Sequence, residues 1–341
     1  MKEKLFGKTL DELTAVTKRL GLPGYTARQL ADWLYKKDIN SIDEMSNLSK
    51  RTREILSNDY EYGLSVPVSA SESSDGTKKY LYNVLNDKYI ETAYIPDKDR
   101  ATICVSSQSG CKMGCIFCMT GKQGFQGNLS SNEILNQFRS LPEFHSLTNI
   151  VYMGMGEPLD NFTELLKSLE ILTGEWGYGW SPTRITVSTV GLIKNVKEFL
   201  EKSRCNLAIS LHSPFDEERR KLMPIQGTNS VKEILSAIKT FDMNRQRRIS
   251  FEYILFKGLN DSPLHIRELA RILNGIRCRI NIIRFHSIPG SSLVSPDMKS
   301  TIQFKEKLNG KGILTTIRSS RGEDIQAACG LLSTLEQNKS R

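Results

Sequence analysis

From about residue 101 onward, short apolar strands alternate with amphipathic helices, and this alternation is the feature that most restricts the fold. The strand candidates are rich in β-branched and aromatic residues, and stretches with helical periodicity lie between them. Six such units in succession predict a parallel sheet with crossover helices. The expected strands are 102–105, 150–153, 185–187, 207–211, 249–255 and 280–283, and the expected helices include 161–172, 231–241 and 262–273.

Two architectures accommodate such a sheet. A curled sheet forms six-eighths of a barrel, a partial (β/α)6 barrel with its functional site at the carboxyl ends of the strands. An open sheet is doubly wound, with helices on both faces. The α/β alternation alone is compatible with either architecture.

The residues before the alternation predict a small helical unit. Thr9 and Glu12 form a capping box ahead of an amphipathic stretch that ends at Gly21. Thr26 and Gln29 repeat the capping pattern. A third short helix is expected over 48–56.

A β-hairpin is expected between the helical unit and the barrel. The Ser-, Asp- and Gly-rich stretch 69–76 predicts a loop, and strands 79–85 and 88–95 predict a hairpin with its turn at Asn86-Asp87. Three segments follow from these patterns. They are a helical accessory domain over 1–58, a linker with the hairpin over 59–100, and a core over 101–335 that includes a cysteine near the C-terminus.

Charge and cysteine content narrow the class of protein. Lys and Arg number 47 against 38 Asp and Glu, a formal net charge of +9 that favours a polyanionic partner such as nucleic acid. The N-terminus is too polar for a secretory signal and no apolar run is long enough to span a membrane, so we expect a cytoplasmic protein. Seven cysteines, an odd number, favour metal or redox chemistry over a disulfide framework.

Three of these cysteines fall within eight residues, in the stretch Cys111-Lys-Met-Gly-Cys115-Ile-Phe-Cys118. Three thiolates at this spacing can close around one metal centre. A zinc site needs a fourth cysteine or histidine, and 119–125 contain none. A four-iron cluster with one open iron needs only three thiolates. The spacing therefore favours an iron–sulfur cluster, with the open iron available to a substrate or cofactor.

The C-x3-C-x2-C spacing, with an aromatic residue before the last cysteine, resembles the radical S-adenosylmethionine (SAM) superfamily. More narrowly, the chain resembles the radical SAM ribosomal RNA adenine-C2 methyltransferases. The likeness covers nearly the whole chain and implies the partial barrel, a [4Fe–4S] cluster whose fourth iron is chelated by SAM, and two SAM molecules per turnover. It is carried by the stretches CVSSQSGCKMGCIFCMTGKQGF, MGMGEPL, VSTVG, AISLH and SSRGEDIQAACG.

The resemblance also implies roles for two cysteines outside the cluster. Because C2 of adenine is not nucleophilic, a first SAM methylates Cys329 instead. A radical generated from a second SAM takes a hydrogen from that S-methyl group, and the carbon radical adds to C2. Cys104 then attacks the Cys329 sulfur, which releases the methylated base and leaves a disulfide. Glu91 matches the position of the acceptor for the C2 proton.

Further positions match the residues that bind SAM in this family. One of them departs from the family pattern, since this chain reads Arg284-Phe285-His286 where many members have asparagine after the aromatic residue. Imidazole can still make one hydrogen bond there. The matching positions are Gly156, Glu157, Ser188, Ser210, Leu211, His212 and His286.

Basic clusters are candidate contacts with RNA phosphates, which would give salt-dependent affinity without sequence readout. The helical unit offers a second basic surface beside an aromatic residue. The candidates are Arg219-Arg220-Lys221, Arg245 with Arg247-Arg248, Arg318 with Arg321, and Tyr25, Arg28 and Lys36-Lys37 in the helical unit.

The resemblance implies 23S ribosomal RNA as the substrate, with its target adenine taken out of the base stack. It also implies an electron donor such as a flavodoxin or ferredoxin, and it leaves open whether transfer RNA is a second substrate. We expect a monomer without a membrane partner. Two alternatives remain, a Cfr-type enzyme that methylates C8 of the same adenine and a non-catalytic iron–sulfur protein that binds RNA. The two extra cysteines argue against the second alternative.

Overall fold

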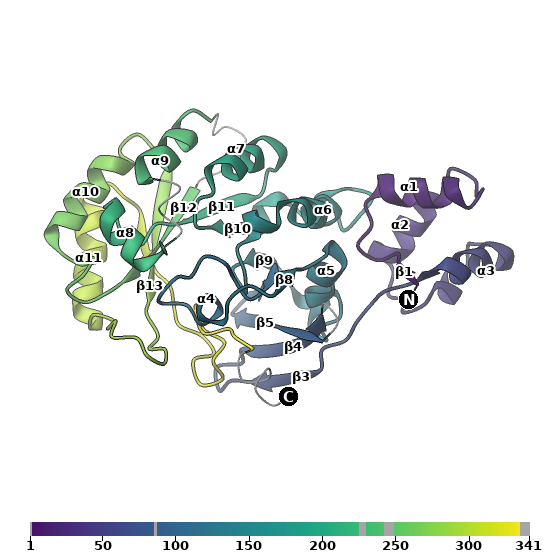
Figure 1. Cartoon of the computed structure of the whole chain (residues 1–341), viewed down its shortest axis with the longest axis horizontal. Helices are drawn as coiled ribbons and strands as arrows, with labels where there is room; N and C mark the ends of the chain where they lie inside the picture. Colours follow the sequence, from purple (N-terminus) through teal and green to yellow (C-terminus); the bar gives the residue numbers. More distant parts are fainter. Residues whose placement is uncertain (1, 85–86, 225–229, 242–248, 335–341) are drawn as a thin grey trace.

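The computed structural model describes residues 2–84, 87–224, 230–241 and 249–334, and a single curved sheet of ten strands runs through it (Figure 1). The strand order is β14-β13-β12-β11-β10-β9-β6-β5-β4-β3. Strands β6 and β9 to β14 are parallel and follow the sequence without a reversal. The parallel strands are β6 (Arg100–Cys104), β9 (Asn149–Tyr152), β10 (Ile185–Thr189), β11 (Asn206–Ser210), β12 (Ile249–Leu255), β13 (Cys278–Arg284) and β14 (Thr315–Ile317).

This strand order decides between the two architectures. A doubly wound sheet reverses its order at a switch point, and these strands do not. The barrel also stays open, because β6 pairs with the antiparallel β5 rather than with β14. The partial barrel is therefore confirmed. All six expected parallel strands form, and β14 adds a short seventh at the edge.

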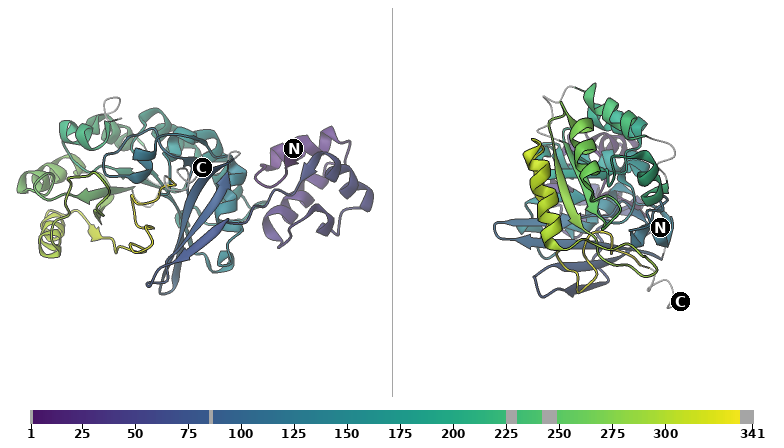
Figure 2. Two further views of the ribbon diagram at one scale, coloured as in Figure 1. Left: turned by 60° about the horizontal axis from the view of Figure 1, so that its bottom comes forward. Right: turned by 90° about the vertical axis from the view of Figure 1, so that its left-hand side faces the viewer.

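Helices cover the outer face of the barrel (Figures 1 and 2). Their apolar sides pack against the strands in one continuous core. The expected helices 161–172, 231–241 and 262–273 all form, and α11 near the C-terminus was not anticipated. The outer helices are α6 (Phe162–Thr173), α7 (Ile193–Lys202), α9 (Val231–Lys239), α10 (Pro263–Leu273) and α11 (Met298–Gly310).

Shorter elements lie in the connections between the strands and outer helices. They are β7 (Gln108–Ser109), α4 (Met119–Gln123), β8 (Gly127–Asn128), α5 (Ser131–Arg139), α8 (Asp216–Leu222), and 3-10 helices at Phe144–Ser146, Pro158–Asn161 and Pro182–Arg184.

The N-terminal unit contains α1 (Leu10–Arg19), α2 (Thr26–Lys36), a 3-10 helix at Ile42–Glu44 and α3 (Lys50–Asp59), with β1 (Glu3–Lys4) paired to β2 (Tyr60–Glu61). The capping box at Thr9 is confirmed, with the Glu12 side chain accepting from Thr9 N at 2.9 Å. The second expected capping box is wrong. Thr26 is the first helical residue and is buried, and its N–H donates to Pro23 O, so a turn at the proline starts α2 instead.

This unit lies at one end of the molecule (Figure 2). It packs on the barrel through aromatic and charged contacts. Tyr35 of α2 meets the rings of Trp176 and Tyr178 edge-on or tilted, at centroid distances of 5.8 and 5.5 Å. Glu12 of α1 pairs with Lys167 of α6 at 2.7 Å. The face with Tyr25, Arg28, Lys36 and Lys37 stays exposed.

The antiparallel edge of the sheet differs in part from expectation. The hairpin forms from β4 (Lys78–Val84) and β5 (Lys88–Asp97), and the expected turn residue Asn86 lies outside the described residues. The loop expected over 69–76 is wrong for its first half, which forms the edge strand β3 (Ser69–Glu72). All four β3 side chains are exposed, so backbone pairing with β4 holds the strand and no apolar pattern marks it. Among the described residues, no helix is long and apolar enough to cross a membrane.

Candidate active site

The three clustered cysteines lie on the loop between β7 and α4, at the carboxyl end of the barrel. Gly110 starts the loop with a φ of +69°, and a Cβ there would lie 1.7 Å from Gly124 O. Only glycine fits this approach. Cys111 N then donates to Gly124 O at 3.2 Å, which closes the loop on itself.

The three thiols are neighbours in an apolar setting. Burial raises the pKa of Cys115 well above its ordinary value, and the charges of Cys118 and Cys111 raise it further. Burial likewise raises the pKa of Cys111 to about 12. No three Cys, His, Asp or Glu side chains of the described residues stand in a metal-ligand arrangement. Buried apolar side chains, two of them from the loop itself, pack around the thiols. They are Met113, Phe117, Leu222, Met223, Phe256 and Phe285.

These residues fit an iron–sulfur cluster. In the metal-free protein, burial and mutual repulsion both oppose ionisation of the thiols. A cationic metal centre would remove both costs by binding the thiolates directly. The three cysteines are therefore suited to hold a cluster, although the loop is not assembled as a ligand set.

A tight turn after β9 packs against the segment that leads to this loop. Gly156 has a φ of +96°, and a Cβ there would lie 2.5 Å from the Gln108 side chain. Glu157 N donates to Gln108 Oε1 at 2.9 Å, and Met155 N donates to Ser106 Oγ at 2.8 Å. The turn with Gly156 and Glu157 is thus fixed beside the cysteine loop.

The Glu157 carboxylate is buried between two strand ends. Its oxygens accept from Leu159 N at 3.1 Å and from Val190 N at 2.9 Å. Burial raises its pKa to about 7, against the opposing effect of hydrogen bonds from Thr189, Val190 and Leu159. Glu157 can therefore change its charge close to neutral pH.

The ends of β10 and β11 bring further predicted residues to the same place. Ser188 and Ser210 are half-buried at these ends, and the Leu211 side chain is fully buried, which leaves only its backbone for a ligand. His212 has a φ of +56°, and its Nδ1 accepts from Ile254 N at 3.0 Å. Burial lowers the pKa of His212 to about 3, so the ring is neutral with its proton on Nε2.

His286 lies after β13 and is also buried. Its Nε2 is 2.8 Å from Ser320 Oγ. Its Nδ1 is 3.2 Å from Glu323 Oε1, but not in hydrogen-bonding geometry. The His286 imidazole thus contacts the C-terminal segment and keeps one ring nitrogen for another partner.

That C-terminal segment, residues 318–334, runs beside α4 and β5 at the mouth of the barrel (the yellow trace in Figure 1). Hydrogen bonds from α4 and to β5 help to hold its end. Met119 N donates to Gly330 O at 2.8 Å, Thr120 Oγ1 to Leu332 O at 2.6 Å, and Ser333 N to Glu91 Oε2 at 2.9 Å. These bonds place Cys329 next to the cysteine loop.

Cys104 and Cys329 are brought together by this arrangement. Cys104 ends β6, is buried and packs against Ala327. Burial, together with the nearby Cys329, raises its pKa to about 12. Solvent reaches the Cys329 side chain, although the protein around it raises its pKa and Arg318 opposes that effect. The two cysteines, far apart in sequence, are neighbours in the fold.

Glu91 lies on β5 and is 2% exposed, so it is not a solvent-facing strand carboxylate. Its Oε1 pairs with Lys79 at 2.8 Å and its Oε2 accepts from Ser333 N. The carboxylate therefore sits at the same mouth as Cys329.

A polar network inside the barrel was missed from the sequence. Glu252 Oε1 accepts from Asn281 at 2.8 Å and from Arg318 at 3.2 Å, and Glu252 Oε2 is buried without a hydrogen-bond partner among the described residues. This network positions Arg318 beside the two cysteines. A single carboxylate in the otherwise uncharged stretch ISFEYIL was the available signal.

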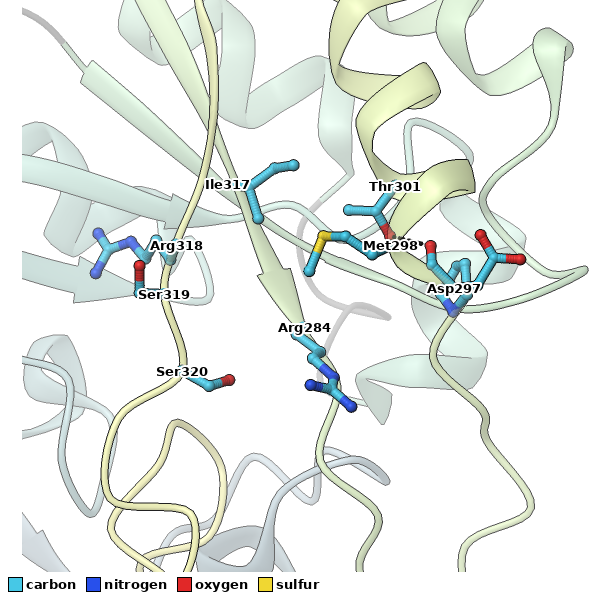
Figure 3. A pocket seen from close by; sticks show the side chains of 9 residues that line it. Arg284, Asp297, Met298, Thr301, Ile317, Arg318, Ser319 and Ser320 are labelled. Carbon is cyan, nitrogen blue, oxygen red and sulfur yellow. Dashed lines mark hydrogen bonds between the residues drawn. The ribbon is translucent and has the colours of Figure 1, made fainter. Parts of the chain in front are cut away.

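A cavity of about 300 Å³ lies on the other side of β14 and the segment after it (Figure 3). The Arg284 side chain enters it, whereas the Arg318 guanidinium points away (Figure 3). Its lining combines cationic, anionic and hydroxyl groups from β13, α11 and the C-terminal segment. The lining residues are Arg284, Pro296, Asp297, Met298, Thr301, Ile317, Arg318, Ser319 and Ser320.

The basic clusters expected to contact RNA differ in how exposed their side chains are. Arg219 is 1% exposed, so its assignment as a phosphate contact is wrong, whereas its neighbours Arg220 and Lys221 are exposed. Arg318 and Arg321 are each 33% exposed and pair with Glu252 and Asp97. Arg245, Arg247 and Arg248 lie outside the described residues.

Comparison with known proteins agrees with this geometry. The model of the Radical SAM superfamily matches residues 105–270, and that of the ribosomal RNA large subunit methyltransferase N-terminal domain matches residues 3–61. A probable dual-specificity RNA methyltransferase RlmN of Bacteroides fragilis is 56% identical, over 99% of this chain and 98% of its own. The dual-specificity RNA methyltransferase RlmN of Desulfotalea psychrophila is 40% identical, over 99% and 97%.

A solved structure supports the same grouping. The crystal structure of a radical SAM methyltransferase from Sphaerobacter thermophilus superposes with a TM-score of 0.90 at 36% identity, covering 97% of this chain and 99% of that one. Sequence and fold therefore agree over the full length. The chain belongs to the radical SAM superfamily and, within it, to the family of dual-specificity RNA methyltransferases RlmN.

Proposed function

We propose that this enzyme methylates C2 of an adenine in 23S ribosomal RNA, through an S-methyl group on Cys329. The observation that carries the proposal is the meeting of Cys329 with Cys104 and with the cysteine loop at one mouth of the barrel. A binding protein would not need two further thiols at that place. The name of the Bacteroides fragilis relative extends the proposal to a second RNA class, and an adenine in the anticodon loop of transfer RNA is the candidate.

The cysteines of the site have three different proposed roles. When bound by Cys111, Cys115 and Cys118, a [4Fe–4S] cluster supplies the electron that cleaves SAM to a 5′-deoxyadenosyl radical. Cys329 holds the methyl group and presents it to the base, since its side chain is the exposed one. Cys104, buried beside it, attacks the Cys329 sulfur and frees the product. One thiol therefore carries the methyl group and the other releases it.

Glu91 is the proposed acceptor of the C2 proton. Lys79 and Ser333 N hold its two oxygens in place, so the carboxylate is fixed at the mouth rather than free to rotate. Since Ser333 follows Cys329 by four residues, the same segment carries the methyl group and positions the base acceptor.

SAM is proposed to bind across the strand ends that carry Gly156, Glu157, Ser188, Ser210, Leu211, His212 and His286. Glu157 is the candidate partner of the SAM ammonium, because its carboxylate lies beside the cysteine loop. The Ser188 and Ser210 hydroxyls are suited to the ribose or the carboxylate, and two SAM molecules would use this site in turn. An external one-electron donor, a flavodoxin or ferredoxin, is required.

RNA is proposed to bind both at the barrel mouth and on the N-terminal unit over residues 1–58. Tyr25, Arg28, Lys36 and Lys37 are exposed on that unit, where aromatic and cationic side chains can contact bases and phosphates. The linker and hairpin over 59–100 join this unit to the core over 101–335. We propose that the enzyme acts in the cytoplasm as a monomer.

The pKa of Glu157 makes SAM binding dependent on pH. Below pH 7 the carboxyl group is protonated and neutral, and above it the group is ionised and attracts the SAM ammonium. The affinity for SAM should therefore rise between about pH 6 and pH 8. Glu157→Gln should bind SAM at least about tenfold more weakly and lose this dependence. Equilibrium binding to the reconstituted enzyme measures both, and a rise with pH that persists in Glu157→Gln would remove Glu157 from this role.

The product identifies the function. Reconstituted enzyme is incubated with SAM, a reductant and 23S ribosomal RNA lacking the modification, and the RNA is digested to nucleosides. The expected product is 2-methyladenosine. Formation of 8-methyladenosine would reassign the target atom, and RNA binding without any methylated nucleoside would contradict the proposal.

A further inference from the structure

Arg219, on α8, is the most completely buried large side chain of the described residues that carries a charge. Its guanidinium faces the ends of two barrel strands. Nε donates to Leu211 O at 3.2 Å, and Nη2 donates to Ser210 O at 2.9 Å and to Val190 O. Carbonyl groups therefore satisfy its hydrogen bonds, but they do not neutralise its charge.

The guanidinium remains charged. Burial lowers the pKa of Arg219 to about 10, which is still well above neutral pH. Within the described part of the chain it forms no direct ion pair; the Asp216 carboxylate, one turn earlier on α8, acts on Arg219 from a distance and accepts from Val231 N. A buried charge without a directly paired opposite charge is costly, so an anion is expected near it in the working enzyme.

The cysteine loop lies next to Arg219. Ile116 N donates to Leu222 O at 3.1 Å, which ties the loop to the end of α8, and Met223 N donates to Arg219 O at 2.7 Å. Arg219 and Cys115 are close enough for each to influence the charge of the other. The buried Arg219 cation thus lies within electrostatic range of a sulfur that would carry negative charge.

We propose that Arg219 is the buried counter-charge of the iron–sulfur cluster. The proposal rests on the proposed function, because it requires a cluster on the three cysteines. A [4Fe–4S] cluster with three thiolates carries net negative charge, and reduction adds one more negative charge. The cation therefore stabilises the cluster in both states and the reduced state most, which raises the reduction potential.

A purely structural role makes a different prediction. If Arg219 only ties the ends of β10 and β11 together, its loss should loosen the strand ends that bear Ser188, Ser210 and His212. Affinity for SAM would then fall while the potential of the SAM-free cluster stayed the same. The reduction potential separates the two roles, since it responds to charge near the cluster.

Arg219→Gln, Arg219→Lys and Arg220→Gln are compared with the wild-type chain after anaerobic reconstitution. Glutamine keeps a donor and removes the charge, and lysine keeps the charge. Arg220→Gln is the matched control. It removes the same charge from the next residue along α8, whose side chain is 51% exposed. Iron and sulfide per chain are measured first. The midpoint potential is then measured without SAM or RNA, by redox titration followed by electron paramagnetic resonance.

Arg219→Gln is expected to hold less iron and to have a more negative midpoint potential, whereas Arg219→Lys and Arg220→Gln stay near wild type. An unchanged potential in Arg219→Gln, or an equal shift in Arg220→Gln, would overturn the proposal. If Arg219→Gln does not fold, Arg219→Lys decides: a folded lysine variant with a lowered potential contradicts a role based on charge. Absence of a cluster in the wild-type chain would instead contradict the proposed function.

Discussion

Cys329→Ala protein should be purified without an S-methyl group, should form no covalent complex with RNA and should methylate nothing. The thiolate of Cys329 is the proposed acceptor of the first methyl group, so its removal stops the reaction before the base is reached. Loss of a nucleophile lowers turnover by roughly three orders of magnitude or more. The mass of the purified protein and the yield of methylated nucleoside measure this result.

Cys104→Ala should stop the reaction at its last step, the release of the methylated base from Cys329. Cys329 would still be methylated and would still join to the base, but no second thiolate would be placed to displace its sulfur. A protein–RNA species should then accumulate and appear as a shifted band under denaturing conditions. Cys278→Ala is the matched control, since Cys278 begins β13 at the amino end of the strand, away from the mouth. An adduct with Cys329→Ala, or full turnover with Cys104→Ala, would mean that the two roles are wrong.

Replacing Cys111, Cys115 or Cys118 by alanine should abolish reductive cleavage of SAM. Two thiolates cannot hold a site-differentiated cluster, so iron per chain should fall and 5′-deoxyadenosine should not form above background. The protein should stay folded, because the loop is closed by backbone bonds such as Cys111 N to Gly124 O rather than by the thiols. Iron analysis and chromatography of 5′-deoxyadenosine measure the two effects.

The same control variant, Cys278→Ala, should keep both iron and cleavage. A variant at one of the three loop positions that cleaves SAM at the wild-type rate would contradict the assignment of that cysteine. Cleavage lost with iron retained would point to a defect in SAM binding instead.

The barrel could be predicted from the sequence because its strands are short runs rich in β-branched and aromatic residues, with helical stretches between them. Strand β12, ISFEYIL, is buried at every residue, and five of its seven residues are apolar. Strand β3 shows the opposite case. Its side chains are all exposed and backbone pairing alone defines it, so composition indicated a loop.

Some parts of the site could likewise be predicted from the sequence, and others could not. The cysteine loop and the turn at Gly156 are local motifs, and their spacing is visible in the chain. The contact of Cys104 with the Cys329 segment joins residues from opposite parts of the core, so only the fold brings them together. Arg219 was misassigned because a run of three basic residues does not show which of them faces inward. On α8 the first is buried and the next two are exposed.

The central claim is that the methyl group passes through the sulfur of Cys329. It is tested most directly with SAM bearing a fully deuterated methyl group, given to enzyme whose Cys329 has been loaded from the same SAM. One deuterium should leave the S-methyl group and appear in 5′-deoxyadenosine. The methyl group of the 2-methyladenosine should then retain two deuterium atoms and gain one hydrogen from solvent. Product with all three deuterium atoms in the methyl group, and none in 5′-deoxyadenosine, would contradict the account.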